Sequence, residues 1–155
     1  YLLGDFGVRV AGRGASLVAP VRTLAWGDWV HQGLPFYAGN LTYRCRITAP
    51  GGRLALSAPW FKTPLLTVAL DGRRVGAIAY DPWHLDLGEV AAGDHDLEIT
   101  AYGNRINAFG AVHNALPDWK WWGPNSWEMT GAGWTSEYRL WPMGLTSAPH
   151  LEVPI

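Results

Sequence analysis

The sequence predicts an all-β fold, an antiparallel β-sandwich. Short stretches of its 155 residues alternate between apolar and polar side chains, and turn residues separate them. The chain has 19 Gly and 11 Pro, enough for many turns, and no convincing amphipathic helix. Seven or eight short strands at this spacing are typical of two packed antiparallel sheets. The length fits one domain, residues 1–155, with a core of its own.

Two strand candidates lie near the N-terminus. In residues 6–10, Phe6, Val8 and Val10 alternate with Gly7 and Arg9, and a Gly-Arg-Gly turn follows. Residues 17–21 form a second short apolar candidate.

The clearest half-buried strand covers residues 42–49. Tyr43, Cys45, Ile47 and Ala49 alternate there with Thr and Arg, and a Pro-Gly-Gly turn closes the stretch. Leu54 and Leu56 then resume the apolar face.

The remaining strands are predicted at residues 66–70, 75–78, 97–101 and 134–140. The first two flank Asp71-Gly72, and Asp-Gly between apolar runs is a strong signal for a β-hairpin. In residues 134–140, Trp134, Tyr138 and Leu140 share one face of the expected strand.

Composition excludes several classes of partner. The formal net charge is −1, which gives no electrostatic reason to expect nucleic acid or an anionic membrane as a partner. No apolar run reaches the ~18 residues that cross a bilayer.

The single cysteine, Cys45, has no internal disulfide partner, and the alternating pattern around it predicts a buried thiol. The chain starts at Tyr1, which suggests a piece of a larger protein, and Arg outnumbers Lys, which hints at a bacterial source.

Several segments in a fixed order carry a resemblance to a known family. They are residues 42–46 (TYRCR), 54–56 (LAL), 68–76 (VALDGRRVG), 85–87 (LDL) and 93–99 (GDHDLEI). This order resembles the galactose-binding-domain-like jelly roll found as the sugar-binding domain of family 2-type bacterial glycoside hydrolases. Two positions depart from the family pattern, because Asp71 and either His95 or Asp96 stand where Asn is usual.

The resemblance implies an accessory domain rather than an enzyme. In such proteins the hydrolytic carboxylates lie on a separate barrel, and the jelly roll packs beside it. The expected partners are therefore a carbohydrate and the catalytic domain of the parent chain, and this chain would be a C-terminal fragment of that parent. Two functions stay open: the domain binds glycan, or it only braces the catalytic domain.

The leading candidate for a sugar site is the Trp-rich stretch of residues 118–127, which is expected to be a loop. Trp119, Trp121 and Trp122 offer flat apolar faces for a pyranose, and Asn125 offers planar hydrogen-bonding groups. The alternative is that these indoles seal one end of the sandwich or pack against the parent protein.

Further candidates are the amides Asn104 and Asn107, which follow the strand at 97–101, and Gln32 with Tyr37 in an earlier loop. Arg105, beside Asn104, is suited to the carboxylate of an acidic sugar. Asn104 and Asn107 are equally suited to satisfying backbone groups in a turn. For the loop with Gln32 and Tyr37, the alternative is that its aromatic residues are core residues entering a strand.

No cofactor is expected. The histidines lack metal-binding spacing, although Asp81, Asp86 and Glu137 are candidate ligands for a structural calcium ion. Catalysis by the chain itself would need two carboxyl groups across a cleft, and Asp118 and Glu128 flank the Trp-rich stretch. No nucleophile elbow or phosphate-binding loop is present.

Overall fold

The computed structural model describes residues 2–116 and 123–153 of the chain. The fold divides into two compact units. Unit 1 comprises Tyr1–Ala25, Trp29–Ala38 and Asn104–Pro142, and unit 2 comprises Trp26–Asp28, Gly39–Gly103 and Met143–Ile155. Both units are built from segments that are distant in sequence. The expectation of one domain over residues 1–155 stays a prediction.

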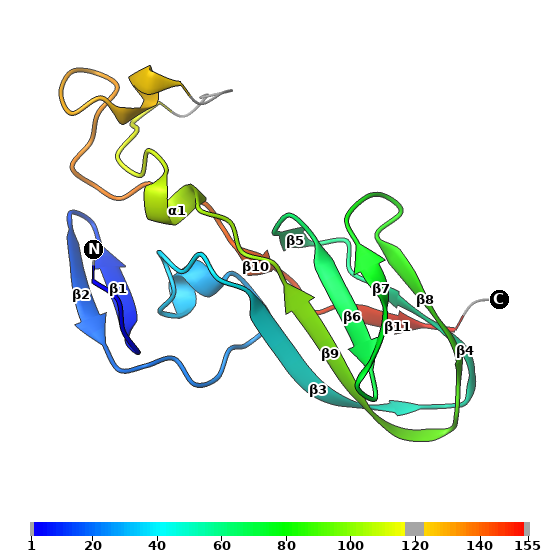
Figure 1. The fold of residues 1–155 in the computed structure, drawn as a ribbon. Helices are drawn as coiled ribbons and strands as arrows, with labels where there is room; N and C mark the ends of the chain where they lie inside the picture. Colours follow the sequence, from blue (N-terminus) through cyan, green and yellow to red (C-terminus); the bar gives the residue numbers. More distant parts are fainter. Residues whose placement is uncertain (1, 117–122, 154–155) are drawn as a thin grey trace. The chain divides into compact units, whose positions relative to one another are not determined.

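The described residues of unit 1 form one β-hairpin and three short helical turns (Figure 1). The hairpin pairs β1 (Gly7–Ala11) with β2 (Gly14–Val18) in antiparallel register. The helical turns are η1 (Trp29–Gln32), α1 (Ile106–Phe109) and η2 (Pro124–Trp127). The two predicted N-terminal strands are thus present, with the second shifted toward the turn.

Unit 2 is built from antiparallel sheets. A four-stranded sheet has the order β3-β9-β6-β7, and a three-stranded sheet has the order β11-β4-β8 (Figure 1). The first sheet comprises β3 (Leu41–Ala49), β9 (Gly93–Ala101), β6 (Leu66–Leu70) and β7 (Arg73–Ile78). The second comprises β11 (His150–Glu152), β4 (Gly52–Ser57) and β8 (His84–Val90). A small third sheet pairs β5 (Phe61–Lys62) with β10 (Gly144–Leu145).

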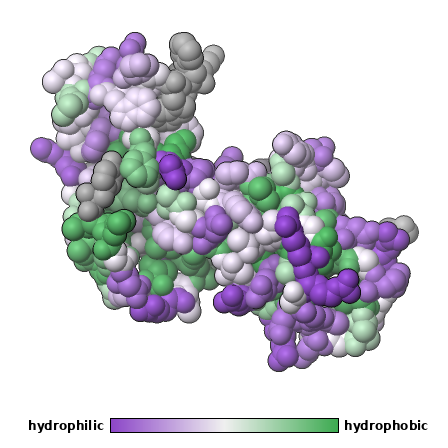
Figure 2. All heavy atoms as spheres, in the orientation of Figure 1, coloured by the Kyte–Doolittle hydropathy of each residue, from purple (hydrophilic) through white to green (hydrophobic). Residues whose placement is uncertain are grey.

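The alternation predicted for residues 42–49 and 97–101 is confirmed by the pairing of β3 with β9. Tyr43 lies opposite Ile99 on the buried face. On the outer face, the Arg44 guanidinium pairs with a carboxylate of β9 at 2.8 Å, and Thr42 Oγ1 lies 2.9 Å from Thr100 Oγ1. The surface over this sheet is largely hydrophilic in Figure 2.

The core of unit 2 lies between the two larger sheets. Leu54 and Leu56 from β4, and Leu66 and Val68 from β6, are almost completely buried. Strands β7 and β8 approach closely, because a Cβ atom added at Gly76 would lie 2.6 Å from Cδ1 of a β8 leucine. The predicted all-β antiparallel sandwich is therefore confirmed.

The hairpin predicted at Asp71-Gly72 is also present, between β6 and β7. Both turn residues adopt positive φ, 49° for Asp71 and 76° for Gly72. This is the conformation that Asp-Gly favours in tight hairpins.

The strand predicted at residues 134–140 is wrong. Within that stretch the structure shows only an isolated bridge between Trp134 and Asn114. Its backbone instead makes irregular hydrogen bonds: Arg139 N–H donates to Val112 O at 2.7 Å, and Tyr138 N–H donates to Gly12 O at 3.2 Å.

No helix in the described part of the chain is long and apolar enough to cross a membrane.

Candidate ligand cavity

A cavity of about 1050 Å³ lies within unit 1. Its walls come from β1, β2, η1 and the segments 111–116 and 137–141. Apolar side chains of the β1–β2 hairpin form one side, and Figure 2 shows apolar surface in this region. The polar and aromatic residues that line it are Arg9, His31, Gln32, Asn114, Glu137, Tyr138, Arg139 and Trp141.

Tyr138 lies in a cluster of aromatic rings. Its ring centroid is 5.3 Å from that of Phe36 and 4.8 Å from that of His113. His113 in turn packs against Trp134 at 6.4 Å, and its Nδ1 donates to the Glu137 carbonyl at 3.3 Å. These contacts hold the phenol ring in place, so one aromatic face of the cavity is formed in advance of any ligand.

Trp141 is the second aromatic residue of the cavity, and Asn107 fixes its backbone. The amide of Asn107 donates from Nδ2 to Trp141 O at 2.7 Å and accepts Trp141 N–H at Oδ1 at 2.9 Å. Asn107 is only 4% exposed, whereas Trp141 remains 45% exposed. A buried amide thus anchors a residue whose side chain is accessible.

Two arginines and one carboxylate contribute the formal charges of the described lining. Arg139 and Glu137 form a loose ion pair, with 3.8 Å between Nη2 and Oε2, and both side chains are more than half exposed. Arg9 has no ion-pair partner among the described residues. The described part of the lining is therefore slightly positive in a chain whose formal net charge is −1.

Two of the predicted site amides bond to nearby backbone. Gln32 lines the cavity, but its Oε1 accepts Ala25 N–H at 2.8 Å and its Nε2 donates to Ala25 O at 3.2 Å. Asn104 accepts Ile106 N–H at 3.0 Å. The Asn104 contact is the local backbone contact that the alternative interpretation expected, whereas Asn107 bonds to the backbone of Trp141, which is distant in sequence.

The other predicted residues lie elsewhere or outside the described part of the chain. Asn125 is exposed in η2, and Tyr37 contacts Trp29 edge to face at 6.4 Å. Trp119, Trp121 and Trp122 lie outside the described residues, as does Asp118. The cavity lining reaches Leu116, directly before this stretch. The role of all these residues in sugar binding stays a prediction.

The structure brings no group of three or more His, Cys, Asp or Glu side chains together as a metal site within residues 2–116 and 123–153. Of the three candidate calcium ligands, Asp86 pairs instead with Arg53, whose Nε lies 3.1 Å from its Oδ2. This hydrogen bond, with another from Gly88 N–H at 2.9 Å, lowers the pKa of the Asp86 carboxyl.

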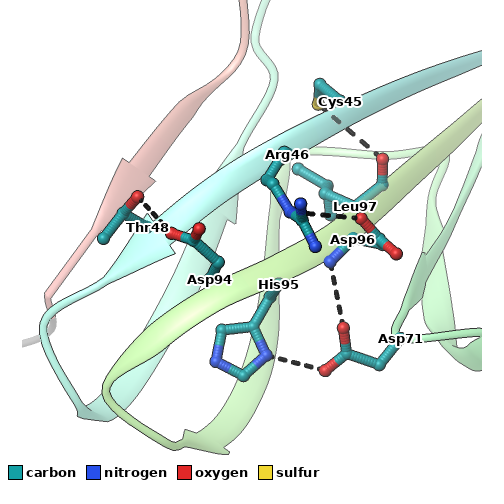
Figure 3. Close-up of polar contacts among 8 residues, drawn as sticks. All are labelled: Cys45, Arg46, Thr48, Asp71, Asp94, His95, Asp96 and Leu97. Atoms are coloured by element: carbon teal, nitrogen blue, oxygen red, sulfur yellow. Dashed lines mark hydrogen bonds and ion pairs between the residues drawn. The ribbon is translucent and has the colours of Figure 1, made fainter.

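Asp71 and His95 form a polar clamp in unit 2 (Figure 3). His95 Nδ1 lies 2.7 Å from Asp71 Oδ2, and its Nε2 lies 2.9 Å from Ala91 O. Because both partners are acceptors, both ring nitrogens must donate, which requires the imidazolium form. The hydrogen bond raises the pKa of His95 and lowers that of Asp71. Asp71 Oδ1 also accepts Asp96 N–H at 2.9 Å, so the pair ties the β6–β7 hairpin to β9.

Cys45 is a half-buried thiol in the same sheet (Figure 3). Its Sγ lies 3.7 Å from Leu97 O, and burial raises its pKa. A raised pKa disfavours the reactive thiolate, in keeping with the predicted structural role.

Comparison with known proteins relates the fold to parts of larger enzymes. The chain is similar to a rhamnosidase from Novosphingobium sp. PP1Y, with a TM-score of 0.52 and 20% identity over 94% of this chain and 14% of that one. The chain shares its fold with part of that protein. No known protein family matches the sequence, and no curated protein matches it.

A GH2 β-galacturonidase from Eisenbergiella tayi is also similar, in two crystal structures. The glycerol-bound structure gives a TM-score of 0.48 at 21% identity over 94% of this chain and 22% of that one. The galacturonate-bound structure gives 0.44 at 26% identity over 68% and 18%. The chain spans less than a quarter of the length of each of these proteins.

Proposed function

We propose that this chain is a non-catalytic module of a larger bacterial glycoside hydrolase and that it binds carbohydrate in the cavity of unit 1. The observation that carries the proposal is the pairing, inside one cavity, of two aromatic residues with hydrogen-bonding side chains. Tyr138 and Trp141 line it together with Asn114, Arg9 and Arg139.

This combination suits a sugar ring. The C–H face of a pyranose packs on an indole or phenol ring, and planar amides and guanidinium groups pair with its hydroxyls. Ordering a site costs binding free energy, and that cost is small where the site is formed beforehand. The Asn107 anchor of Trp141 and the rings packed around Tyr138 provide such order.

The lining also supports a non-catalytic role. Glycoside hydrolysis commonly uses two carboxyl groups, one on each side of the scissile bond. Among the described lining residues, Glu137 is the sole carboxylate. The fold shared with part of a rhamnosidase fits the place of a module beside a separate catalytic domain.

The test is a pair of matched tryptophan substitutions. In Trp141→Ala, we expect loss of binding to mono- and oligosaccharides in an NMR titration, with a thermal unfolding midpoint close to that of the unsubstituted chain. Trp60→Ala is the control, because Trp60 is 66% exposed, belongs to unit 2 and does not line the cavity. Equal binding in both variants, or no binding by the unsubstituted chain across the panel, would overturn the proposal.

A second candidate function is the bracing of a catalytic domain. Trp60 and Tyr80 are 66% and 85% exposed in unit 2. Their loops meet where Phe61 packs against Trp83 with ring centroids 5.3 Å apart. Exposed aromatic side chains of this kind favour a protein contact. If this is the function, a Trp60→Ala, Tyr80→Ala double variant binds the separately produced remainder of the parent protein more weakly, and Trp141→Ala does not.

A further inference from the structure

The charges of the cavity in unit 1 discriminate between classes of sugar. Arg9 comes from β1, and Arg139 comes from the segment 137–141, so the two arginines that line the cavity belong to separate walls. Among the described lining residues, one carboxylate, Glu137, opposes them. A neutral sugar would leave this excess positive charge uncompensated.

These two arginines have weaker ion pairing than Arg22 and Arg44. Arg22 pairs with Asp5 at 2.6 Å, and Arg44 pairs with Glu98 at 2.8 Å. By contrast, Arg139 reaches its partner only at 3.8 Å, and Arg9 pairs with no carboxylate in the described part of the chain. Their guanidinium groups are therefore available to an anionic ligand.

We propose that the ligand of this cavity is an acidic sugar, a uronate, whose carboxylate is bound by Arg9 and Arg139. The inference rests on the proposed function, since it names the class of sugar that the same cavity takes. A guanidinium group presents a planar fork of N–H donors that matches both oxygens of a carboxylate. Tyr138 and Trp141 then serve the apolar face of the ring, as they would for any pyranose.

Glu137 provides a second test, in which a substitution is expected to raise uronate affinity rather than lower it. Its carboxylate lies beside Arg139 and would repel the carboxylate of the ligand while competing for the same guanidinium. The backbone of Glu137 is held separately, because its N–H donates to Thr135 Oγ1 at 3.2 Å. Replacing the acid by its amide therefore removes the competing charge without removing that contact.

The experiment compares two matched pairs of sugars by NMR titration of the 155-residue chain. Galacturonate is compared with galactose, and glucuronate with glucose, because each pair differs only in the carboxylate at C6. The acidic member is expected to bind more tightly, and added salt is expected to reduce the difference. In Arg9→Gln and in Arg139→Gln, uronate affinity should fall about three- to fivefold, in the range of exposed ion pairs, while affinity for the neutral sugar stays unchanged.

Two further variants complete the design. Arg13→Gln is the matched control, because Arg13 is exposed in the turn after β1 and does not line the cavity, so its uronate affinity should be unchanged. Glu137→Gln should bind uronates more tightly. Equal affinity for acidic and neutral sugars would overturn this inference and leave the proposed function standing. Absence of binding to either class of sugar would overturn both this inference and the proposed function. An equal loss of uronate affinity in the Arg9, Arg139 and Arg13 variants would overturn the assignment of the two arginines.

Discussion

Replacing Asn107 tests the anchor on which the aromatic wall of the cavity depends. Asn107→Ala removes both side-chain hydrogen bonds to the Trp141 backbone, at 2.7 and 2.9 Å. A net contribution of roughly 0.5–1.5 kcal/mol per bond gives a loss of about 1–3 kcal/mol in the free energy of unfolding. For a chain of this size, such a loss lowers the unfolding midpoint by roughly 5 °C. Sugar affinity should fall as well, because Trp141 is no longer held.

The measurement is thermal unfolding followed by near-ultraviolet circular dichroism, together with the sugar titration. Asn125→Ala makes the same chemical change at an exposed amide in η2 and should alter the midpoint little. Asn107→Asp keeps the shape and the bond to Trp141 N–H but places a carboxylate oxygen against the Trp141 carbonyl, so it should also destabilise the chain. If Asn107→Ala and Asn125→Ala shift the midpoint equally, the buried amide is not an anchor.

Two other predictions concern the clamp in unit 2 and a glycine in unit 1. The pKa of His95 is raised above 6.5, so its contribution to stability is complete below pH 6.5 and is lost as pH rises through the raised pKa. The pKa of Asp71 is lowered below 3.8, so its contribution to stability is lost only in acid. The difference in unfolding midpoint between the unsubstituted chain and His95→Gln should therefore shrink from about pH 6 to about pH 9, and a difference that widens over this range would refute the clamp. In Gly110→Ala, the new Cβ overlaps the Ile106 carbonyl oxygen, which already accepts Gly110 N–H at 2.9 Å. Denaturant unfolding should therefore show a free energy of unfolding that is lower by about 1–3 kcal/mol. Gly123→Ala is its control, since nothing lies within 4 Å of the added Cβ, and equal losses in the two variants would contradict the steric argument.

The sequence predicted the elements in which local pattern and burial agree. In β3 and β9, alternation along each strand matches one buried and one solvated face, and the Asp71-Gly72 turn needs only local backbone chemistry. Short pairings such as β5 with β10 carry no such signal, because two residues cannot display a period.

The candidate site was harder to predict for a physical reason. Asn107 was a candidate both for a sugar contact and for bonding to backbone groups of a turn, and its amide is buried against the backbone of Trp141, which is distant in sequence. The alternation in residues 134–140 was interpreted as a strand, although these residues instead form irregular contacts around the cavity. A Trp directly after that alternation was the available signal for Trp141.

The order of segments along the chain also affects how the molecule is made. The four strands of the larger sheet all come from residues 41–101, so a nascent chain contains that whole sheet before residue 104 leaves the ribosome. The cavity walls come from residues 8–33 and 111–141, which flank the sheet in sequence. Joining them closes a long loop, and its entropic cost makes such distant contacts slow to form. During synthesis the capacity to hold a ligand therefore appears after the larger sheet, once the segment ending at Trp141 has been made.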